Sequence, residues 1–151
     1  MAEPRYHVVL VRPDIAGNTG NVGRSCMALG CRLHLVHPLG YRITDANLKR
    51  AGMDYWPLLD LKEHDDLDSW LASLPRNAVV FLLSTKGQRD FSAGDVPQGA
   101  YLVFGSESAG LPEAVFGAYP GRARRIPMDA RARSLNLSSS VAMVLGSLIL
   151  K

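Results

Sequence analysis

The chain has 151 residues, a length that suits one compact domain. Hydrophobic residues make up 47% and charged residues 21%, a globular mixture that argues against whole-chain disorder and against a small disulfide-built protein. The net charge of +3 is unevenly spread: residues 60–68 hold five acids and one base, whereas residues 121–134 hold five arginines and one aspartate.

Short apolar runs alternate with helix-like stretches, and Gly, Pro and capping residues separate them. In chain order, the first half predicts a strand at 8–11, a helix from Asn18 or Thr19 to Gly30, a strand at 33–36, a short helix from Thr44 or Asp45 to Ala51, and a strand at 59–61. The second half predicts a helix from Asp65 or Asp66 through Leu74, strands at 78–83 and 101–104, a short helix at 112–116, a strand at 124–126, and an apolar helix at 137–150.

This alternation predicts the fold class. Strands that alternate with helices favour an α/β fold with a mainly parallel sheet and helices on both faces. No repeat or linker interrupts the pattern, so we expect one domain over residues 1–151. Ligands in open α/β sheets bind beyond the carboxyl ends of the strands. Three segments that follow predicted strands hold most of the informative residues.

The ends of the chain and its cysteines bear on where the protein works. The N-terminus lacks the long apolar core of a secretory signal. The longest uncharged run, residues 134–150, contains Asn136 and five serines, whereas a membrane span needs about 20 mostly apolar residues. Cys26 and Cys31 are expected to be free thiols in a reducing compartment. We therefore expect a cytoplasmic protein with no membrane span.

The first segment, residues 13–25, places small residues and amide side chains between a strand and a helix. Backbone N–H groups there can face an anion. Asn18 and Arg24 are expected to reach the N-terminal region of the helix, where Arg24 can pair with a phosphate. A tight turn followed by a helix cap explains the same residues. The spacing matches neither a dinucleotide-binding fingerprint nor a Walker loop.

The second and third segments are residues 102–112 and 126–143. Gly105 directly follows a strand, where a ligand needs close approach to the backbone. Glu107 can accept hydrogen bonds from a ligand or from loop N–H groups, and we favour the role of holding the loop. In the third segment, Ser134 and Asn136 offer helix caps as well as hydrogen bonds to a ligand. An apolar turn followed by these polar residues suits an amphipathic ligand such as an adenosine.

Other chemistries have no support in the sequence. The four histidines show no metal-ligand spacing, and no nucleophile elbow or CxxC pair occurs, so we expect no metal. Tyr55 and Trp56 can stack on a base, although burial of at least one in the core is expected. The arginines of residues 121–134 can attract a polyanion, and a solvated basic loop explains their charge equally well.

Taken together, the three segments resemble the SPOUT superfamily of RNA methyltransferases. The family motifs correspond to NTGNVGR, FGSESAGLP and IPMDARARSLNLSSSVA. RLHLVHPLGY, LKRAGMDYW and STKG also resemble one subgroup, the minimal tRNA (cytidine/uridine-34)-2′-O-methyltransferases. The chain departs from motif two at Ser106 and Ala109, where the family pattern has proline and arginine. Gly105, Glu107 and Gly110 keep the pattern.

The resemblance implies a fold, a cofactor and an assembly. The C-terminal part of the α/β sheet is expected to form a deep trefoil knot. S-adenosylmethionine is expected within the knot, and the family works as a homodimer, for which the helix from Leu137 offers an interface. By motif position, the cofactor-binding residues are Leu83, Gly105, Ile126 and Ser134.

The resemblance also implies a reaction, methyl transfer to the ribose 2′-hydroxyl of nucleotide 34 in the tRNA anticodon loop. Arg24, Asn18 and Asn136 are the expected catalytic residues, and Arg24 is expected to act across the dimer interface. An arginine guanidinium is a poor base, so we expect Arg24 to hold a phosphate and stabilise alkoxide charge. Expected RNA-binding residues are Arg122, Arg124, Arg125, Arg131 and Arg133.

Two alternatives stay open from the sequence. One is a 2′-O-methyltransferase that acts on another tRNA position or on ribosomal RNA. The other is a non-catalytic RNA-binding α/β module, against which the retained motif residues count.

Overall fold

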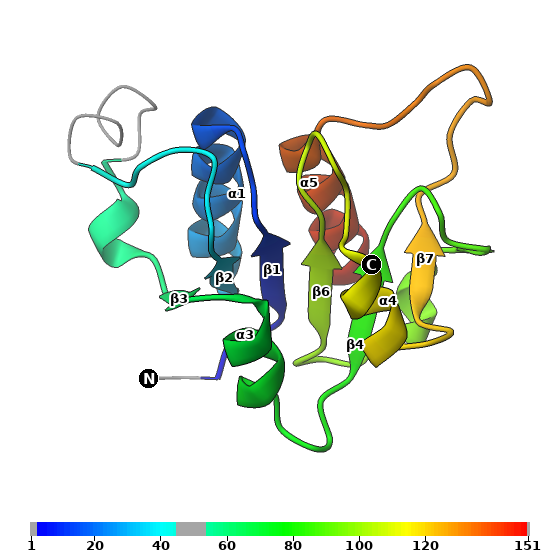
Figure 1. The fold of residues 1–151 in the computed structure, drawn as a ribbon, viewed down its shortest axis with the longest axis horizontal. Coiled ribbons are helices and arrows are strands. Elements are labelled where there is room, and N and C mark those ends of the chain that lie inside the picture. The colour runs from blue at the N-terminus through cyan, green and yellow to red at the C-terminus, as the bar shows by residue number, and fades with distance from the viewer. Residues whose placement is uncertain (1–2, 45–53, 151) are drawn as a thin grey trace.

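The computed structural model describes residues 3–44 and 54–150. Seven strands form one sheet in the order β3-β2-β1-β6-β4-β7-β5, and every neighbouring pair is parallel (Figure 1). The predicted mainly parallel sheet is therefore confirmed. The strands are β1 (His7–Val11), β2 (Arg32–Val36), β3 (Leu61–His64), β4 (Val80–Leu83), β5 (Arg89–Asp90), β6 (Tyr101–Phe104) and β7 (Ala123–Arg125).

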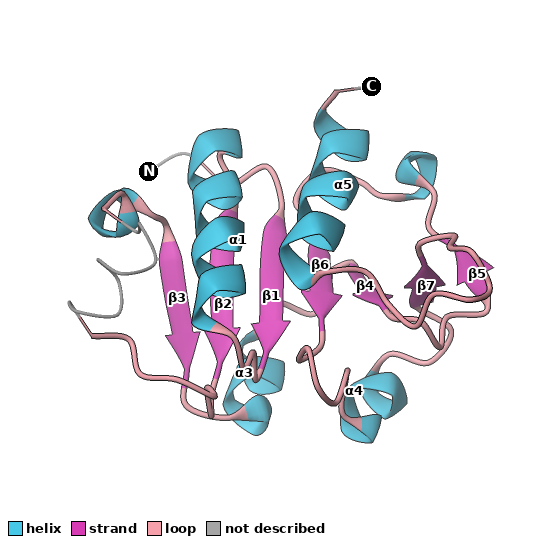
Figure 2. Ribbon diagram, turned by 90° about the horizontal axis from the view of Figure 1, so that it is seen from above, coloured by secondary structure: helices cyan, strands magenta, loops and turns pink. Residues whose placement is uncertain are grey.

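Helices cover both faces of the sheet, as predicted. Helices α1 and α5 lie side by side on one face, and α3 and α4 cover the other (Figure 2). No helix in the described part of the chain has the length and apolar character that crossing a membrane requires. The helices are α1 (Ala16–Leu29), α3 (Leu67–Ser73), α4 (Glu113–Ala118) and α5 (Leu137–Ile149), and short 3-10 helices span Trp56–Leu58 and Ala93–Asp95.

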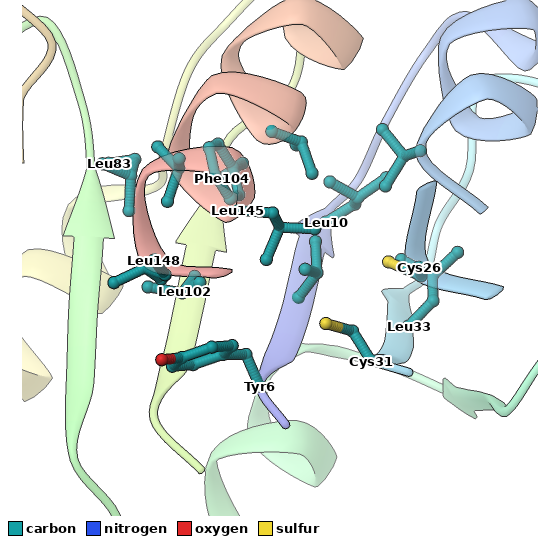
Figure 3. Close-up of a cluster of buried hydrophobic side chains, with 14 of the residues drawn as sticks. Tyr6, Leu10, Cys26, Cys31, Leu33, Leu83, Leu102, Phe104, Leu145 and Leu148 are labelled. Carbon is teal, nitrogen blue, oxygen red and sulfur yellow. The ribbon is translucent and has the colours of Figure 1, made fainter. Parts of the chain in front are cut away.

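Alternate residues of the central strands pack against the two helical layers. Leu10 of β1 packs in one cluster with Val22 of α1 and Val141 of α5. The next residue back along β1, Val9, packs in a second cluster with Val115 of α4. Figure 3 shows the first cluster, between the sheet and helices α1 and α5. Burial on both faces explains why these strands read as continuous apolar runs.

Most of the predicted elements are confirmed. Strand β6 has the predicted bounds. Helix α1 ends at Leu29, and the predicted stop Gly30 caps it with a φ of 71°, which carries no Cβ penalty in glycine. Asp66 caps α3, because its side chain accepts a hydrogen bond from the backbone N–H of Ser69 at 2.8 Å. The short helix predicted to end at Ala51 falls on residues 45–53, which lie outside the described residues.

The predicted start of α1 is wrong. The helix begins at Ala16 rather than at Asn18 or Thr19, and Ile15 makes no side-chain cap. The Asn18 side chain instead hydrogen-bonds with side chains from distant loops. The backbone N–H of Ile15 donates to the carboxylate of Glu107. A group from far along the chain thus takes the place of a local cap, which no local pattern reveals.

The strand predicted at 59–61 lies further along the chain, as β3. Of the predicted residues, only Leu61 pairs with β2, where it lies opposite Leu33. No sequence pattern predicts β5. This strand has two residues, Arg89 and Asp90, and it exists only as an edge partner of β7.

Three histidines from neighbouring strands form a buried row on the sheet. Nδ1 of His7 lies 2.8 Å from Nε2 of His34, and Nδ1 of His34 lies 3.0 Å from Nε2 of His64. The ring of His7 also stacks on Tyr101, with centroids 4.0 Å apart. Burial lowers the pKa of His7 to about 4 and that of His34 to about 2. Among residues 3–44 and 54–150, no group of three His, Cys, Asp or Glu side chains is placed to hold a metal ion.

This histidine row predicts that acid destabilises the fold. Below pH 6.5 the unfolded chain gains protons on these histidines, whereas the folded chain keeps them neutral. The stabilisation is therefore fully present above pH 6.5, and it decreases as the pH falls from there toward about 4 for His7 and about 2 for His34. At pH 5 the loss is about 2 kcal/mol for each of His7 and His34.

Chemical denaturation between about pH 7.5 and pH 5 tests this. His34→Gln is expected to have a shallower decrease of unfolding free energy with acid than the wild type. His37→Gln is the matched control, because His37 is partly exposed and pairs with Glu63 at 2.8 Å. An unchanged pH dependence in His34→Gln would contradict the assignment.

Candidate active site

A cavity of about 470 Å³ lies beyond the carboxyl ends of β1, β6 and β4. Strands β2 and β3 lie on one side of β1, whereas β6 and β4 lie on its other side. The direction in which successive strands are added to the sheet therefore reverses here. Ligands of open α/β sheets bind at such switch points. The structure brings seven of the predicted site residues to this cavity: Asn18, Leu83, Gly105, Glu107, Ile126, Ser134 and Asn136.

The loop after β6, residues 105–111, folds back tightly on itself. Ser106 and Gly110 exchange two backbone hydrogen bonds, of 3.3 and 3.0 Å. A Cβ at Gly105 would overlap the carbonyl carbon of Gly110 and the nitrogen of Leu111, and it would lie 2.7 Å from the Gly110 Cα. Position 105 therefore requires glycine, and its backbone remains open toward the cavity.

Glu107 ties this loop to the segment after β1. Its Oε1 accepts from the backbone N–H of Asp14 at 2.9 Å, and its Oε2 accepts from the N–H of Ile15 at 3.2 Å. Oε2 also accepts from Nδ2 of Asn18 at 3.1 Å. The hydroxyl of Ser108 adds a hydrogen bond to the Asp14 carboxylate. The N–H groups that Glu107 binds thus belong to the neighbouring segment rather than to its own loop.

Asn136 extends this network to the third segment. Its Nδ2 donates to Oδ1 of Asn18 at 3.1 Å. Its Oδ1 accepts from the backbone N–H of Ser139 at 3.2 Å, which caps α5. The chain Glu107–Asn18–Asn136 therefore links residues that follow three different strands. Each amide is oriented by partners on both sides, so the network holds the start of α5 in place at the cavity wall.

The remaining cavity wall divides into apolar and polar parts. Leu83, Phe104, Ile126 and Met128 contribute apolar side chains, whereas Ser134 adds a hydroxyl on an exposed loop. Such a lining suits a ligand that is apolar on one part and hydrogen-bonding on another. Cavity-lining residues to which the sequence reasoning gave no role include Ile15, Leu111 and Phe116, together with Thr85 and Lys86. Thr85 and Lys86 lie in STKG, a segment that already resembles the subgroup and that follows a predicted strand.

Arg24 lies apart from this cavity. It is exposed on α1, about 9 Å along the helix axis from Asn18, as six residues at 1.5 Å each require. Its guanidinium carbon lies 5.7 Å from the centroid of the Tyr55 ring. Within one chain, Arg24 therefore does not line the cavity that Asn18 lines. Tyr55 itself is buried, as expected for at least one of the two aromatic residues there.

Two of the five arginines in the basic cluster hold the edge of the sheet together. Arg124 is only 6% exposed, and its guanidinium donates to the carbonyls of Gly121 and Ala123. Arg122 donates from Nε to the carbonyl of Val80 at 3.0 Å, and its guanidinium lies over the ring of Phe81. Their hydrogen bonds and stacking bind β7 to β4. The predicted set of five phosphate-binding arginines is therefore not one continuous solvent-facing surface.

The other three arginines are exposed. Arg125 pairs with Asp90 at 3.1 Å, and Arg131 pairs with Asp129 at 3.0 Å. Arg133 has no ion pair within the described residues. These side chains lie in and before the loop that leads from β7 to α5, next to the cavity-lining residues of the third segment.

Comparisons with known proteins agree on one family. The model of the SpoU rRNA Methylase family matches residues 5–146. A tRNA (cytidine(34)-2′-O)-methyltransferase of Burkholderia ambifaria is 43% identical over 141 residues, which cover 92% of this chain and 90% of that one. A protein of the same name from Yersinia pestis is 43% identical over 143 residues, with 91% and 88% covered.

Solved structures place the fold in the same group. A structure concerned with 2′-OH methylation of C/U34 on tRNA has a TM-score of 0.86 and 42% identity, with 98% of this chain and 91% of that chain covered. The SpoU methyltransferase AviRb of Streptomyces viridochromogenes, bound to AdoMet, has a TM-score of 0.81 at 24% identity, with 99% and 58% covered. At 24% identity, the similarity to AviRb supports the fold alone. With its family model matched over nearly the whole chain, this protein belongs to the SpoU rRNA methylase family.

Proposed function

We propose that this protein transfers a methyl group from S-adenosylmethionine to the ribose 2′-hydroxyl of cytidine or uridine 34 in the tRNA anticodon loop. One observation carries the proposal. The three segments that build the cavity at the switch point belong to a chain that is 43% identical, over 92% of its length, to a tRNA (cytidine(34)-2′-O)-methyltransferase. A single-stranded loop presents unstacked nucleotides. One such nucleotide can approach a cavity of this size.

The cavity fits the proposed cofactor. Its volume of about 470 Å³ is within the usual range for small-molecule sites. Gly105 lets the loop 105–111 fold tightly back at the cavity wall, where Gly105 itself lines the cavity, and Leu83 and Ile126 supply apolar walls for an adenosine. We assign these three residues and Ser134 to cofactor binding. When bound, S-adenosylmethionine supplies a methyl group activated by a sulfonium. No metal is part of the proposal.

The chain's own residues position the reacting groups. Asn18 and Asn136 hold each other, and Glu107 fixes Asn18, so we assign the two amides to orienting the nucleotide and the methionine end of the cofactor. We assign Arg24 to holding a phosphate beside the 2′-hydroxyl and to stabilising negative charge on its oxygen. Positioning of this kind supplies roughly 7–11 kcal/mol of a barrier in favourable cases.

A homodimer completes this site in our proposal. Arg24 does not line its own chain's cavity, so it serves the cavity of the partner. Helices α1 and α5 lie side by side on one face and expose apolar side chains outward, among them Met27 at 37% and Met143 at 53% exposure. An isologous interface over these two helices would bury those side chains and carry Arg24 to the partner.

We also propose the C-terminal trefoil knot of the family. In support, the chain leaves β7 near one edge of the sheet and returns to α5, which packs beside α1 near the centre (Figure 1). Helix α5 also contacts the 3-10 helix Ala93–Asp95. Because knots are rare in proteins, the proposal of a knot rests on the family resemblance.

We propose further that residues 1–151 act as one domain, in the cytoplasm, where tRNA is modified.

The tRNA partner is proposed to lie along the exposed arginines. Arg131 and Arg133 follow the cavity-lining residues of the third segment and face solvent, which favours contacts with phosphates. Arg125 can join them by giving up its exposed ion pair with Asp90. Arg122 and Arg124 act through strand β7, which they stabilise, because Arg124 is buried and each guanidinium already donates to backbone carbonyls.

Transfer of radiolabelled methyl groups to defined tRNAs tests the function. We expect label in tRNA transcripts with cytidine or uridine at position 34, and none when the ribose at position 34 is 2′-deoxy. Label at another nucleotide would replace the substrate assignment with a different 2′-O-methyltransferase. Binding of tRNA without transfer to any RNA, across conditions, would favour the non-catalytic module.

A further inference from the structure

Arg12 has a backbone conformation that its side chain disfavours. It directly follows β1 and has a φ of 55°, the only positive φ of a non-glycine residue in the described part of the chain. An L-residue with a side chain pays a steric penalty in this left-handed region, whereas glycine does not. Strained residues of this kind cluster at functional sites, where the side chain is the reason for keeping them.

The surrounding structure imposes this conformation from two sides. The backbone N–H of Arg12 donates to the carbonyl of Val36 at the end of β2, at 2.9 Å. The carbonyl of the next residue, Pro13, accepts from the N–H of Gly40 at 3.0 Å. A Cβ at Gly40 would lie 2.7 Å from the Asp14 Cα, so the two segments touch. These contacts therefore hold the turn in one conformation. Glycine at position 12 would adopt the same conformation with less strain.

The side chain of Arg12 has no structural task of its own. It is exposed, and it makes no ion pair within residues 3–44 and 54–150. The only acid close to it in sequence, Asp14, already receives the hydroxyl of Ser108. Three residues after Arg12, Ile15 lines the cavity. An unpaired guanidinium is therefore carried by the residue that follows β1, three residues before the cavity-lining Ile15.

From the strained backbone, the exposed unpaired side chain and the position three residues before the cavity-lining Ile15, we propose that Arg12 binds a phosphate of the RNA substrate next to the methylated nucleotide. This inference rests on the proposed function. A guanidinium binds phosphate oxygens through two parallel N–H groups, and such contacts fix the register of an RNA without reading its sequence. Arg12 thus adds a substrate-binding residue outside the three family motifs.

Two substitutions separate this role from a purely structural one. Arg12→Gly removes the guanidinium and relieves the backbone, so it is expected to raise the thermal unfolding midpoint by about 2–4 °C while weakening RNA binding. Arg12→Ala removes the guanidinium and keeps the strained backbone, so it is expected to weaken RNA binding equally with little change in the midpoint. Arg12→Lys keeps the charge and is expected to restore most of the affinity.

The measurement is fluorescence anisotropy of a labelled anticodon stem-loop RNA over a range of salt concentrations. The Ala and Gly variants are expected to bind about 10-fold more weakly at low salt, and the slope of log K against log salt is expected to decrease by about 0.7–0.9, one phosphate contact. Arg5→Ala is the matched control, because Arg5 is an exposed arginine just before the opposite end of β1. It is expected to change neither value.

Steady-state kinetics give a second readout. Arg12→Ala is expected to raise KM for tRNA and to leave kcat nearly unchanged, since the contact exists before and during the reaction. Wild-type affinity and salt slope in both Arg12→Ala and Arg12→Gly would overturn the inference, even if the protein methylates nucleotide 34. If the wild type methylates no RNA but its RNA affinity depends on Arg12, the proposed function fails and the phosphate contact stands.

Discussion

Arg24→Ala is expected to reduce methyl transfer to tRNA by about 10²–10³-fold while leaving the affinity for S-adenosylmethionine unchanged. The two effects separate because we assign Arg24 to the phosphate and the 2′-hydroxyl of the RNA, whereas the residues assigned to the cofactor line the cavity and are unchanged. Isothermal titration calorimetry measures the cofactor affinity, and single-turnover transfer of a labelled methyl group measures the rate.

Controls separate this role from a general effect on α1. Asn21→Ala changes an exposed residue one turn earlier on the same helix and is expected to keep full activity. Arg24→Lys keeps the charge but loses the forked geometry, so it is expected to recover only part of the rate. Equal losses of cofactor binding and transfer in Arg24→Ala would contradict the catalytic assignment.

Mixed dimers test whether Arg24 acts across the interface. A dimer of one Arg24→Ala chain and one chain with a blocked cavity, such as Gly105→Ala, contains one intact composite site. Co-expression of two inactive variants is therefore expected to recover about one quarter of the wild-type activity. If Arg24 acted within its own chain, each site in the mixed dimer would carry one defect, and no activity would return.

Gly105→Ala is expected to abolish cofactor binding, with a loss of affinity of at least about 10²-fold and a loss of stability of about 1–3 kcal/mol. A Cβ at this position overlaps backbone atoms of Gly110 and Leu111, which cannot yield as a flexible side chain can. The loop 105–111 must then open, and Glu107 moves with it. Its hydrogen bonds to Asp14 and Asn18 weaken as a consequence.

Gly117→Ala is the matched control for this substitution. Gly117 lies in α4, and a Cβ there meets no atom within 4 Å. The change is expected to be neutral or slightly stabilising, because alanine is the better helix former. Calorimetric titration with S-adenosylhomocysteine and thermal unfolding measure both effects. Wild-type cofactor affinity in Gly105→Ala would show that the tight turn does not shape the site.

The local sequence was sufficient for the elements that local rules determine. Strands β1, β4 and β6 are buried on both faces, so their apolar runs are visible without any partner. Gly30 and Asp66 mark a helix end and a helix start through contacts within a few residues. The three segments of the cavity follow strands, so their convergence at one edge of a parallel sheet was also predictable.

Contacts between distant residues decided the rest. The start of α1 depends on Glu107, more than 80 residues away, and the buried row of His7, His34 and His64 forms only when three strands pair in register.

Periodicity and turn chemistry act over short stretches, so the α/β class, the order of most elements and the segments that form the cavity can be read without a structure. What individual polar side chains do there depends on contacts between segments that are far apart in the chain. The tertiary structure engaged Arg124 with backbone carbonyls, joined Asn18 to Asn136, and left Arg12 and Arg24 exposed. The reason is that one guanidinium has several possible partners, such as a carbonyl, an aromatic ring or a phosphate, and only the packing of distant segments determines which of these it meets.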